Sequence, residues 1–325
     1  MQVNPVAFAE RKSVLPKNIF VAIIYIIILL FIIVGVVSFL SAWKITHPGK
    51  TTTPQISANI APNYKNISFY YGESSEKING WFFPSTGSKN TVLMIHSYGR
   101  NRLEFDEATF KLITRFNNEK FNVLTVDLRG SGNSSGSITT FGKNETEDVL
   151  TAIKYLKQQG TEKIVLMGFS TGASACLSAV AKTSYKDSIL GVIGDSPYAT
   201  IDNYINNKIE ADNLLPEIPF DFTIDFITRK LSKVSSEMNI TTQIPEILPT
   251  PILLIDGAQK ELPASENTKL LYELYFRKSP VQAHYWNSGA QEYGSSFLAK
   301  PNEYMGKVTE FIKLCIAEAA RAETK

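Results

Sequence analysis

A serine stands at the centre of a glycine-flanked motif that is typical of an enzymatic nucleophile. Residues 168–172 read Gly-Phe-Ser-Thr-Gly, with Ser170 in the middle. The apolar run 164–167 predicts a strand before the motif, and the small residues 173–175 predict a helix after it. A serine at such a turn is held in a strained conformation that lifts its hydroxyl above the sheet, which suits nucleophilic attack on an acyl group. The backbone N–H of Thr171 would face the developing oxyanion, at a helix N-terminus that favours negative charge.

A serine hydroxyl needs a base within hydrogen-bond reach, and the base needs an orienting acid. Histidine is the usual base, and the chain contains three: His47, His96 and His284. His284 lies inside a predicted strand at residues 281–286, so it is a candidate base, with a packed or surface histidine as the alternative. His96 ends another predicted strand, and His47 lies just beyond an apolar run near the N-terminus.

From about residue 64 onward, the hydrophobic pattern alternates between segments typical of strands and segments typical of helices. These elements would position the candidate side chains. Buried apolar strands that alternate with helices predict an α/β fold, in which helices cover both faces of a mostly parallel sheet. A capping box of Asn144 and Glu147 predicts the start of one helix, and Gly160 ends it. The predicted strands cover residues 67–71, 78–83, 91–96, 121–127, 163–169, 189–195, 251–256 and 281–286, and the other predicted helices cover residues 103–117, 171–182, 265–276 and 302–320.

Residues 197–250 interrupt this alternation. The stretch is rich in Pro, Asn and aromatic residues, and its patterns suggest short helices. It follows the strand that ends at Asp195, so we interpret it as a lid inserted over the top of the sheet, with a purely structural insertion as the equal alternative. The aromatic composition suggests apolar substrates.

Several motifs resemble those of the α/β-hydrolase superfamily, in particular its serine-aminopeptidase-like or prolyl-oligopeptidase-like branch. Residues 96–102 read HSYGRNR, where the family has its H-G-x-x-G oxyanion loop. Residues 127–134 read DLRGSGNS and match the family's D-x-R-G-x-G-x-S turn. The motif around Ser170 follows at the family's spacing, and residues 195–197 resemble the segment after its sixth strand. The resemblance spans about residues 64–320.

This resemblance implies an eight-stranded α/β-hydrolase fold and assigns further roles. Tyr98 and Thr171 would supply the N–H groups of the oxyanion hole. His96 is normally structural at this position, and Asp127 and Arg129 would fix loops rather than take part in chemistry. The family acts without a cofactor on ester, amide or lipid-like acyl groups.

The catalytic acid and histidine of the family are not retained here. The acid normally follows the seventh strand, where residues 256–263 read DGAQKELP; Lys260 takes its place, and the adjacent Glu261 is the candidate acid. The histidine normally follows the eighth strand, where residues 287–293 read NSGAQEY. Glu292 is the candidate base in that loop, although a carboxylate with an ordinary pKa of about 4.3 is a weak base unless burial raises that pKa.

A membrane anchor is predicted near the N-terminus. Residues 19–40 form 22 consecutive uncharged and mostly apolar positions, which as a helix span roughly 33 Å, about the thickness of a bilayer core. The alternative, a cleaved signal peptide, usually has an apolar region of about 7–15 residues. The flanks carry Arg11, Lys12 and Lys17 before the run, and Lys44 and Lys50 after it. This bias favours a cytoplasmic N-terminus and a hydrolase domain on the outer or lumenal side.

The predicted organisation therefore has an anchor, a tether and a catalytic domain. It comprises a basic segment at residues 1–18, a transmembrane helix at 19–40, a tether at 41–63, the α/β-hydrolase domain at 64–320 with its lid at 197–250, and a tail at 321–325.

Composition narrows the possible partners. The chain has 33 basic and 31 acidic residues, so its formal charge of +2 gives no reason to expect nucleic acid. Two cysteines alone cannot form a disulfide framework or a four-ligand zinc site. No dinucleotide fingerprint is present, so no cofactor is expected. A small-molecule or lipid-like ligand and the membrane itself remain as expected partners.

These observations lead to two main functional hypotheses. The first is a membrane-anchored serine hydrolase that acts through Ser170, with Glu292 or His284 as an atypical base and Glu261 as the acid. The second is a catalytically impaired relative that uses its pocket or surface to bind a ligand or a protein partner, because the acid and histidine of the family are both replaced. A purely structural membrane protein is a third hypothesis.

Overall fold

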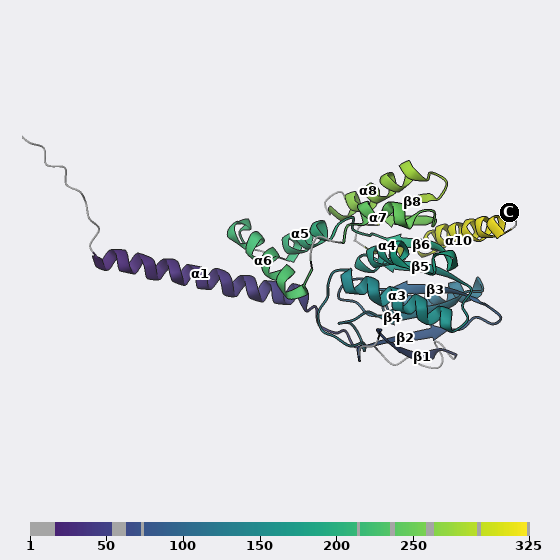
Figure 1. Ribbon diagram of the computed structural model, residues 1–325, viewed down its shortest axis with the longest axis horizontal. Helices are drawn as coiled ribbons and strands as arrows, with labels where there is room; N and C mark the ends of the chain where they lie inside the picture. The colour runs from purple at the N-terminus through teal and green to yellow at the C-terminus, as the bar shows by residue number, and fades with distance from the viewer. Residues whose placement is uncertain are drawn as a thin grey trace, which may run out of the picture.

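The computed structural model describes residues 17–53, 63–72, 75–212, 215–234, 238–257, 263–290 and 294–323. Its centre is an eight-stranded sheet in the order β1-β2-β4-β3-β5-β6-β7-β8 (Figure 1). The second strand runs antiparallel to both of its neighbours, and the remaining pairs are parallel. The strands are β1 (Lys65–Tyr70), β2 (Lys77–Phe83), β3 (Asn90–Ile95), β4 (Asn122–Asp127), β5 (Lys163–Phe169), β6 (Ile189–Asp195), β7 (Ile252–Asp256) and β8 (Ala283–Asn287).

Helices cover both faces of this sheet, as the sequence predicts. The helices are α1 (Lys17–Thr46), α2 (Ala108–Asn118), α3 (Lys143–Gln158), α4 (Thr171–Lys182), α5 (Ile201–Asp212), α6 (Glu217–Ser232), α7 (Ile240–Ile247), α8 (Pro263–Lys278), α9 (Ser296–Ala299) and α10 (Pro301–Glu323), with a short 3₁₀ turn at Lys186–Ser188. Apolar side chains of α3, α4, α7 and α8 form one core with the sheet, and those of α2 and α10 form the other. The strands between β4 and β7 are buried on both faces, which explains their unbroken apolar runs.

The start of α3 differs from the predicted capping box. Gly142 is the N-cap, with φ 110°, and Glu145 rather than Glu147 closes the box. The Glu145 carboxylate accepts hydrogen bonds from the Gly142 N–H at 2.8 Å and from the Thr140 N–H at 2.9 Å. The turn at Gly142 places Asn144 already inside the helix, so Asn144 cannot serve as its cap.

The insertion after β6 divides into two parts. An isolated β-bridge joins Thr200 to Asn239, so the excursion away from the sheet begins and ends at this pair. Within it, α5 and α6 project from the end of the molecule at which the parallel strands finish (Figure 1). The last helix, α7, packs against α4 and α8 and covers the sheet instead. The part that leaves the sheet is therefore α5 and α6, which is shorter than the insertion predicted at residues 197–250; these two helices are called the lid helices, or the lid, below, after that prediction.

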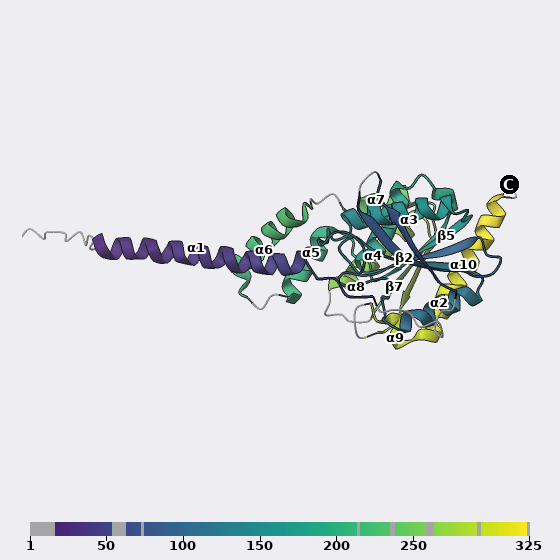
Figure 2. The ribbon, with the colours of Figure 1, turned by 90° about the horizontal axis from the view of Figure 1, so that it is seen from below.

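The N-terminal helix α1 is long and apolar enough to cross a membrane. Residues 17–33 are exposed on every face, whereas Ser38, Ala42 and Ile45 are buried near the other end. Figures 1 and 2 show α1 extending away from the sheet on the same side as the lid, with α6 crossing beside its C-terminal part.

The segment predicted as a tether is partly ordered against the catalytic domain. The helix continues to Thr46, because Ala42 and Ile45 extend the apolar stripe that packs into the body. Beyond the helix, the Lys50 ammonium donates to the carbonyl of Ser134, and the side-chain amide of Asn101 donates to the Thr51 hydroxyl at 3.1 Å.

Candidate active site

Ser170 occupies a strained turn between β5 and α4. Its backbone has φ 50° and ψ −116°, a region that side-chain-bearing residues rarely adopt. The Ser170 N–H donates to the carbonyl of Asp195 at the end of β6, at 2.8 Å, and this bond ties the turn to the neighbouring strand. Thr171 begins α4, so its N–H belongs to the first turn, whose amides have no acceptor within the helix. This geometry is the one expected for a nucleophile beside an oxyanion site.

Both glycines of the motif are required by close backbone contacts. A Cβ atom at Gly168 would overlap the backbone of Gly172, and a Cβ atom at Gly172 would overlap the carbonyl oxygens of Ile95 and His96. The elbow, residues 168–172, thus packs directly against the end of β3. This contact brings Thr171 next to the start of the loop that carries Tyr98.

The loop expected to form the oxyanion site, residues 96–102 and called the oxyanion loop below, is hydrogen-bonded to a buried glutamate. Glu104 accepts hydrogen bonds from the N–H and from the hydroxyl of Ser97, both at 2.7 Å. Serine stands where the H-G-x-x-G pattern has its first glycine, and its hydroxyl provides the extra donor that Glu104 uses. No sequence pattern singles out Glu104, whose role depends on a serine seven residues earlier.

The last turn of α1 also contacts this loop. The Tyr98 hydroxyl donates to the carbonyl oxygen of Ile45 at 2.8 Å, and the Tyr98 ring stacks on Phe141 at 6.3 Å. One residue further along α1, the carbonyl of Thr46 accepts from the Thr139 N–H at 3.0 Å. The N-terminal helix is therefore part of the wall around the candidate site, which no local sequence pattern indicates.

His96 has the structural role implied by the family resemblance. Its Nε2 accepts a hydrogen bond from the Leu128 N–H at 3.0 Å, so Nδ1 carries the proton and donates to the Ser97 carbonyl at 2.7 Å. Burial lowers the pKa of His96, which keeps the ring neutral. Because both nitrogens are engaged in fixing loops, His96 cannot act as the base for Ser170.

Asp127 and Arg129 also fix loops, as expected. The Asp127 carboxylate accepts from the N–H of Arg102, from its guanidinium and from the Asn133 N–H, and all three bonds are buried or partly buried. Arg129 pairs with the buried Asp148 at 2.6 Å. These two networks shape the loops after β3 and β4 without reaching the elbow.

The strand register places His284 far from the nucleophile. Phe169, Asp195, Ile255 and Trp286 lie level with one another across the sheet. His284 on β8 is therefore level with Met167, three residues before Ser170. Three strand spacings separate β5 from β8, which is about 14 Å. The imidazole packs edge-on against an aromatic ring of α10 instead. This separation removes His284 from the candidate bases.

The remaining histidine, His47, packs against the end of α1. His47 stacks on Trp43 at 3.8 Å, and its Nδ1 contacts the Trp43 carbonyl. Glu261 and Glu292, the candidate acid and base, lie outside the described residues. Among the residues that the structure does describe, no side chain hydrogen-bonds the Ser170 hydroxyl.

Buried carboxyl groups line the edge of the sheet near the elbow. Burial raises the pKa of Glu104 to about 7, that of Asp195 at the end of β6 to about 7, and that of Asp256 at the end of β7 to about 6. The charges of Glu104 and Asp195 also disfavour each other. Burial raises the pKa of Tyr304 of α10, and the nearby Asp195 carboxylate raises it further. Three carboxyl groups that titrate near neutrality are therefore positioned around this edge.

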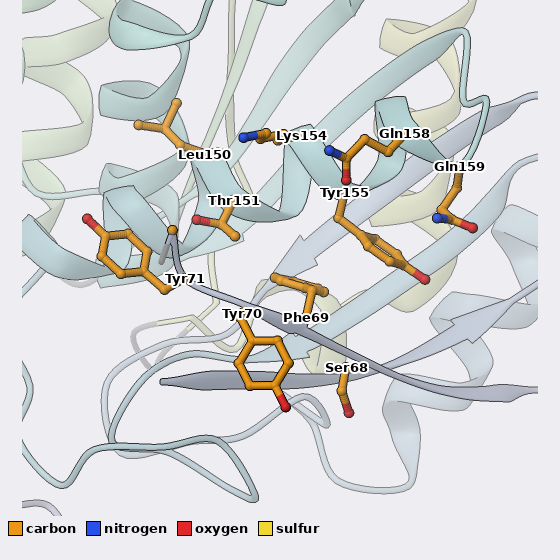
Figure 3. Close-up of a pocket in the computed structure, with 11 residues that line it drawn as sticks. Ser68, Phe69, Tyr70, Tyr71, Leu150, Thr151, Lys154, Tyr155, Gln158 and Gln159 are labelled. Carbon is orange, nitrogen blue, oxygen red and sulfur yellow. The ribbon is translucent and has the colours of Figure 1, made fainter. Parts of the chain in front are cut away.

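A separate groove lies between the edge strand β1 and α3 (Figure 3). It has a volume of about 700 Å³, and stacking of Phe69 on Tyr155 at 4.9 Å forms part of its wall. Tyr70, Tyr71 and Lys154 also line it. None of the candidate site residues lines this groove, so it is distinct from the elbow.

Comparison with known proteins agrees with this architecture. A family model for the α/β hydrolase fold matches residues 90–233. The chain is 25% identical over 238 residues to the uncharacterized protein YqkD of Bacillus subtilis, and this alignment covers 72% of this chain and 75% of that protein. It is 24% identical over 209 residues to the uncharacterized protein YfhR of Escherichia coli, and that alignment covers 63% of this chain and 66% of that protein.

Solved structures with the same fold include proteins described as esterases. The Pyrococcus furiosus esterase Pf2001 has a TM-score of 0.67 at 24% identity, and the alignment covers 83% of this chain and 98% of that one. A thermostable carboxyl esterase from Bacillus coagulans has a TM-score of 0.55 at 14% identity, with 77% and 98% covered. The family match, the strand order and the elbow around Ser170 together show that this chain has the α/β-hydrolase fold.

Proposed function

We propose that this protein is a membrane-anchored serine hydrolase that cleaves ester, amide or lipid-like acyl groups through Ser170. The observation that carries the proposal is the strained backbone of Ser170 at the N-terminus of α4. A strained conformation persists only where the surrounding structure holds it, and such positions cluster at active sites. The structures of similar fold that are named esterases make a carboxylic ester the first substrate class to test.

In this reaction the Ser170 hydroxyl oxygen forms a bond to the acyl carbon, and its proton passes to a base. The N–H groups of Tyr98 and Thr171 stabilise the charge on the carbonyl oxygen. The base then returns the proton to the leaving alcohol or amine, and water releases the acyl group by the same steps. We assign the base to Glu292, in the loop where the family has its histidine, and the acid to Glu261.

The anchor is the uncharged part of α1, and the positive charges before it favour a cytoplasmic N-terminus. The hydrolase domain then lies on the outer or lumenal side, with the elbow facing back toward the membrane.

A specific observation favours the second candidate function, a catalytically impaired relative that binds a ligand or a protein partner. His96 has both nitrogens engaged in fixing loops, and His284 lies about 14 Å from the elbow by strand spacing. A hydrolase without an effective base retains only the acceleration from its oxyanion site and from binding.

Labelling with a fluorophosphonate probe tests the proposal, because the probe reacts only with an activated serine. The wild type, Ser170→Ala and Ser178→Ala are compared in detergent. Ser178 is a matched control, since it is a buried serine of the same helix whose hydroxyl has no hydrogen-bond partner among the described residues. We expect labelling of the wild type and Ser178→Ala and none of Ser170→Ala. A folded wild type that does not react would favour the impaired relative.

The same assay tests the base. Glu292→Gln should lower the labelling rate strongly if Glu292 takes the proton, whereas an unchanged rate would remove Glu292 from the mechanism. Assays with short-chain and long-chain esters then define the acyl preference.

A further inference from the structure

The lid helix α6 carries a stripe of exposed apolar side chains. Phe222 and Phe226 are four residues apart in the regular part of the helix and therefore lie on one face, with exposed fractions of 78% and 54%. Ile218, 87% exposed, precedes them at a position where the backbone is not helical. On the other side of α6, Ile224 and Thr228 are buried, and the helix packs against α1 and α5. A soluble helix normally turns polar residues outward, so this helix has apolar surface on both sides.

Contacts with α1 fix the level of this stripe relative to the proposed anchor. The hydroxyls of Ser38 and Thr223 are hydrogen-bonded at 2.7 Å. Ser38 lies inside the uncharged run, two residues before its end at Leu40. Phe222 is adjacent to Thr223 in the sequence, so it lies level with the last turns of that run.

Both helices also bury small residues. Ser38 and Ala42 are buried one turn apart on α1, and Thr228 and Ser232 are buried one turn apart on α6. Small residues are common where helices pack in membranes. The first turns of α6 lie farther from the sheet than its last turns, in both views of the molecule (Figures 1 and 2).

The charged residues of α6 differ between its two ends. Glu217 and Asp221 lie in its first turns, beside the exposed apolar side chains. Lys230 continues the exposed face at the end nearer the body, with its Nζ 5.6 Å from the centre of the Phe226 ring. Arg229 is paired with Asp225 at 2.8 Å and with Asp202 of α5 at 2.6 Å. A cation therefore lies at the end of the stripe where lipid headgroups would begin. Trp43, 47% exposed and three residues past the uncharged run, has the position of an interfacial aromatic residue.

We propose that the exposed Phe222 and Phe226 face of α6, with Ile218 just before it, lies in the same bilayer leaflet as the end of α1 and contacts lipid acyl chains. The lid and the anchor then form one membrane-bound unit over the candidate active site. This inference rests on the proposed anchoring by α1, and it adds that the lid itself is a lipid-binding surface. In this arrangement the candidate active site lies next to the bilayer, so its substrates would enter from the lipid.

Fluorescence quenching in vesicles tests this contact. Single cysteines replace Leu29 of α1, Phe222 of α6 and Val281, each is labelled with an environment-sensitive NBD group, and the full-length protein is placed in phosphatidylcholine vesicles. Part of the lipid carries a doxyl quencher on its acyl chain. Val281 is the matched control, because it is 73% exposed and lies just before the start of β8. The lid lies at the other end of the parallel strands, where they finish. The native Cys176 and Cys315 are buried, and unmodified protein measures their background labelling.

We expect loss of emission at Leu29 and Phe222 and unchanged emission at Val281. Quenching at Leu29 with Phe222 behaving like Val281 would overturn the lid contact and leave the anchor intact. Absence of quenching at Leu29 would overturn the anchor and the lid contact together. The substitutions at Phe222 and Val281 are at exposed positions, so the fold should tolerate both.

Discussion

The hydroxyl of Tyr98 donates a hydrogen bond to the carbonyl oxygen of Ile45, at 2.8 Å, and so joins the oxyanion loop to the last turn of the N-terminal helix. The loop whose N–H would stabilise the reaction is thus positioned partly by the helix that we propose as the membrane anchor. A neutral hydrogen bond of this kind contributes about 0.5–1.5 kcal/mol. That is enough to change how often the loop adopts its reactive geometry.

Tyr98→Phe should therefore slow the reaction of Ser170 while leaving the fold intact. The variant keeps the ring that stacks on Phe141 and removes the hydroxyl that bonds to Ile45. We expect the fluorophosphonate labelling rate to fall by up to about tenfold, which corresponds to about 1.4 kcal/mol. Tyr70→Phe, at a position 59% exposed on β1, is the control and should react at the wild-type rate. Equal rates for the two variants would show that the bond does not affect the site.

Gly172→Ala should destabilise the protein and abolish labelling. The added methyl group would overlap the carbonyl oxygens of Ile95 and His96, which belong to rigid backbone. Overpacking of this kind costs about 1–3 kcal/mol. Gly306→Ala is the matched control, because a Cβ atom at Gly306 in α10 meets no neighbour, and alanine favours a helix by about 1 kcal/mol. Thermal unfolding in detergent should show opposite shifts for the two variants.

The buried Glu104 should make stability depend on pH near neutrality. Burial raises its pKa from 4.5 to about 7 in the folded state, so the folded protein binds this proton more tightly than the unfolded chain. The contribution of this proton to the free energy of unfolding is fully present below pH 4.5 and is lost as the pH rises through about 7. A pKa shift of this size corresponds to about 3 kcal/mol of unfolding free energy.

Glu104→Gln isolates that effect, because glutamine retains hydrogen-bonding atoms for Ser97 but does not titrate. The difference in unfolding free energy between wild type and variant should change steadily from pH 4.5 to about 7. A difference that is constant over this range would show that Glu104 does not titrate there. Asp195 is expected to contribute a similar dependence that both proteins share, since burial raises its pKa to about 7 as well.

Breaking the buried ion pair between Arg102 and Asp127 should be far more costly than breaking a surface pair. Both side chains are at most 3% exposed, so Arg102→Met leaves the Asp127 carboxylate buried without its partner. We expect a loss of about 3–5 kcal/mol in unfolding free energy. Lys89→Met removes an exposed pair with Glu162, 69% and 58% exposed, and should cost at most about 1 kcal/mol. Urea unfolding of both variants measures the contrast.

Much of the fold was predictable because its signals are local. The apolar runs of the parallel strands, the glycines of the elbow and the small residues of α4 each specify their own conformation, and the structure places all eight predicted strands within two residues of their expected bounds. The elbow was predictable for the same reason, since Gly168 and Gly172 are required wherever backbone approaches this closely.

The parts that the sequence did not predict depend on residues far apart in the chain. Nothing around Ser38 indicates that Thr223 is its partner, and nothing around Ile45 indicates a bond to Tyr98. The role of Glu104 also required the structure, because a single buried glutamate has no periodic signal. The sequence left His284 as a candidate base, and only the pairing of β7 with β8 placed it away from the elbow.

The contact between Ser38 and Thr223 also sets the order in which the molecule can be completed. The two residues are 185 positions apart, so at about 5–20 residues per second the ribosome needs about 10–40 s to reach the second after the first. With α1 as the anchor, the membrane helix is made first and remains without its partner helix during that interval. The two lid helices are therefore added late, onto a helix that is already in place, and the loop that carries Tyr98 is supported by a helix that was synthesised before it.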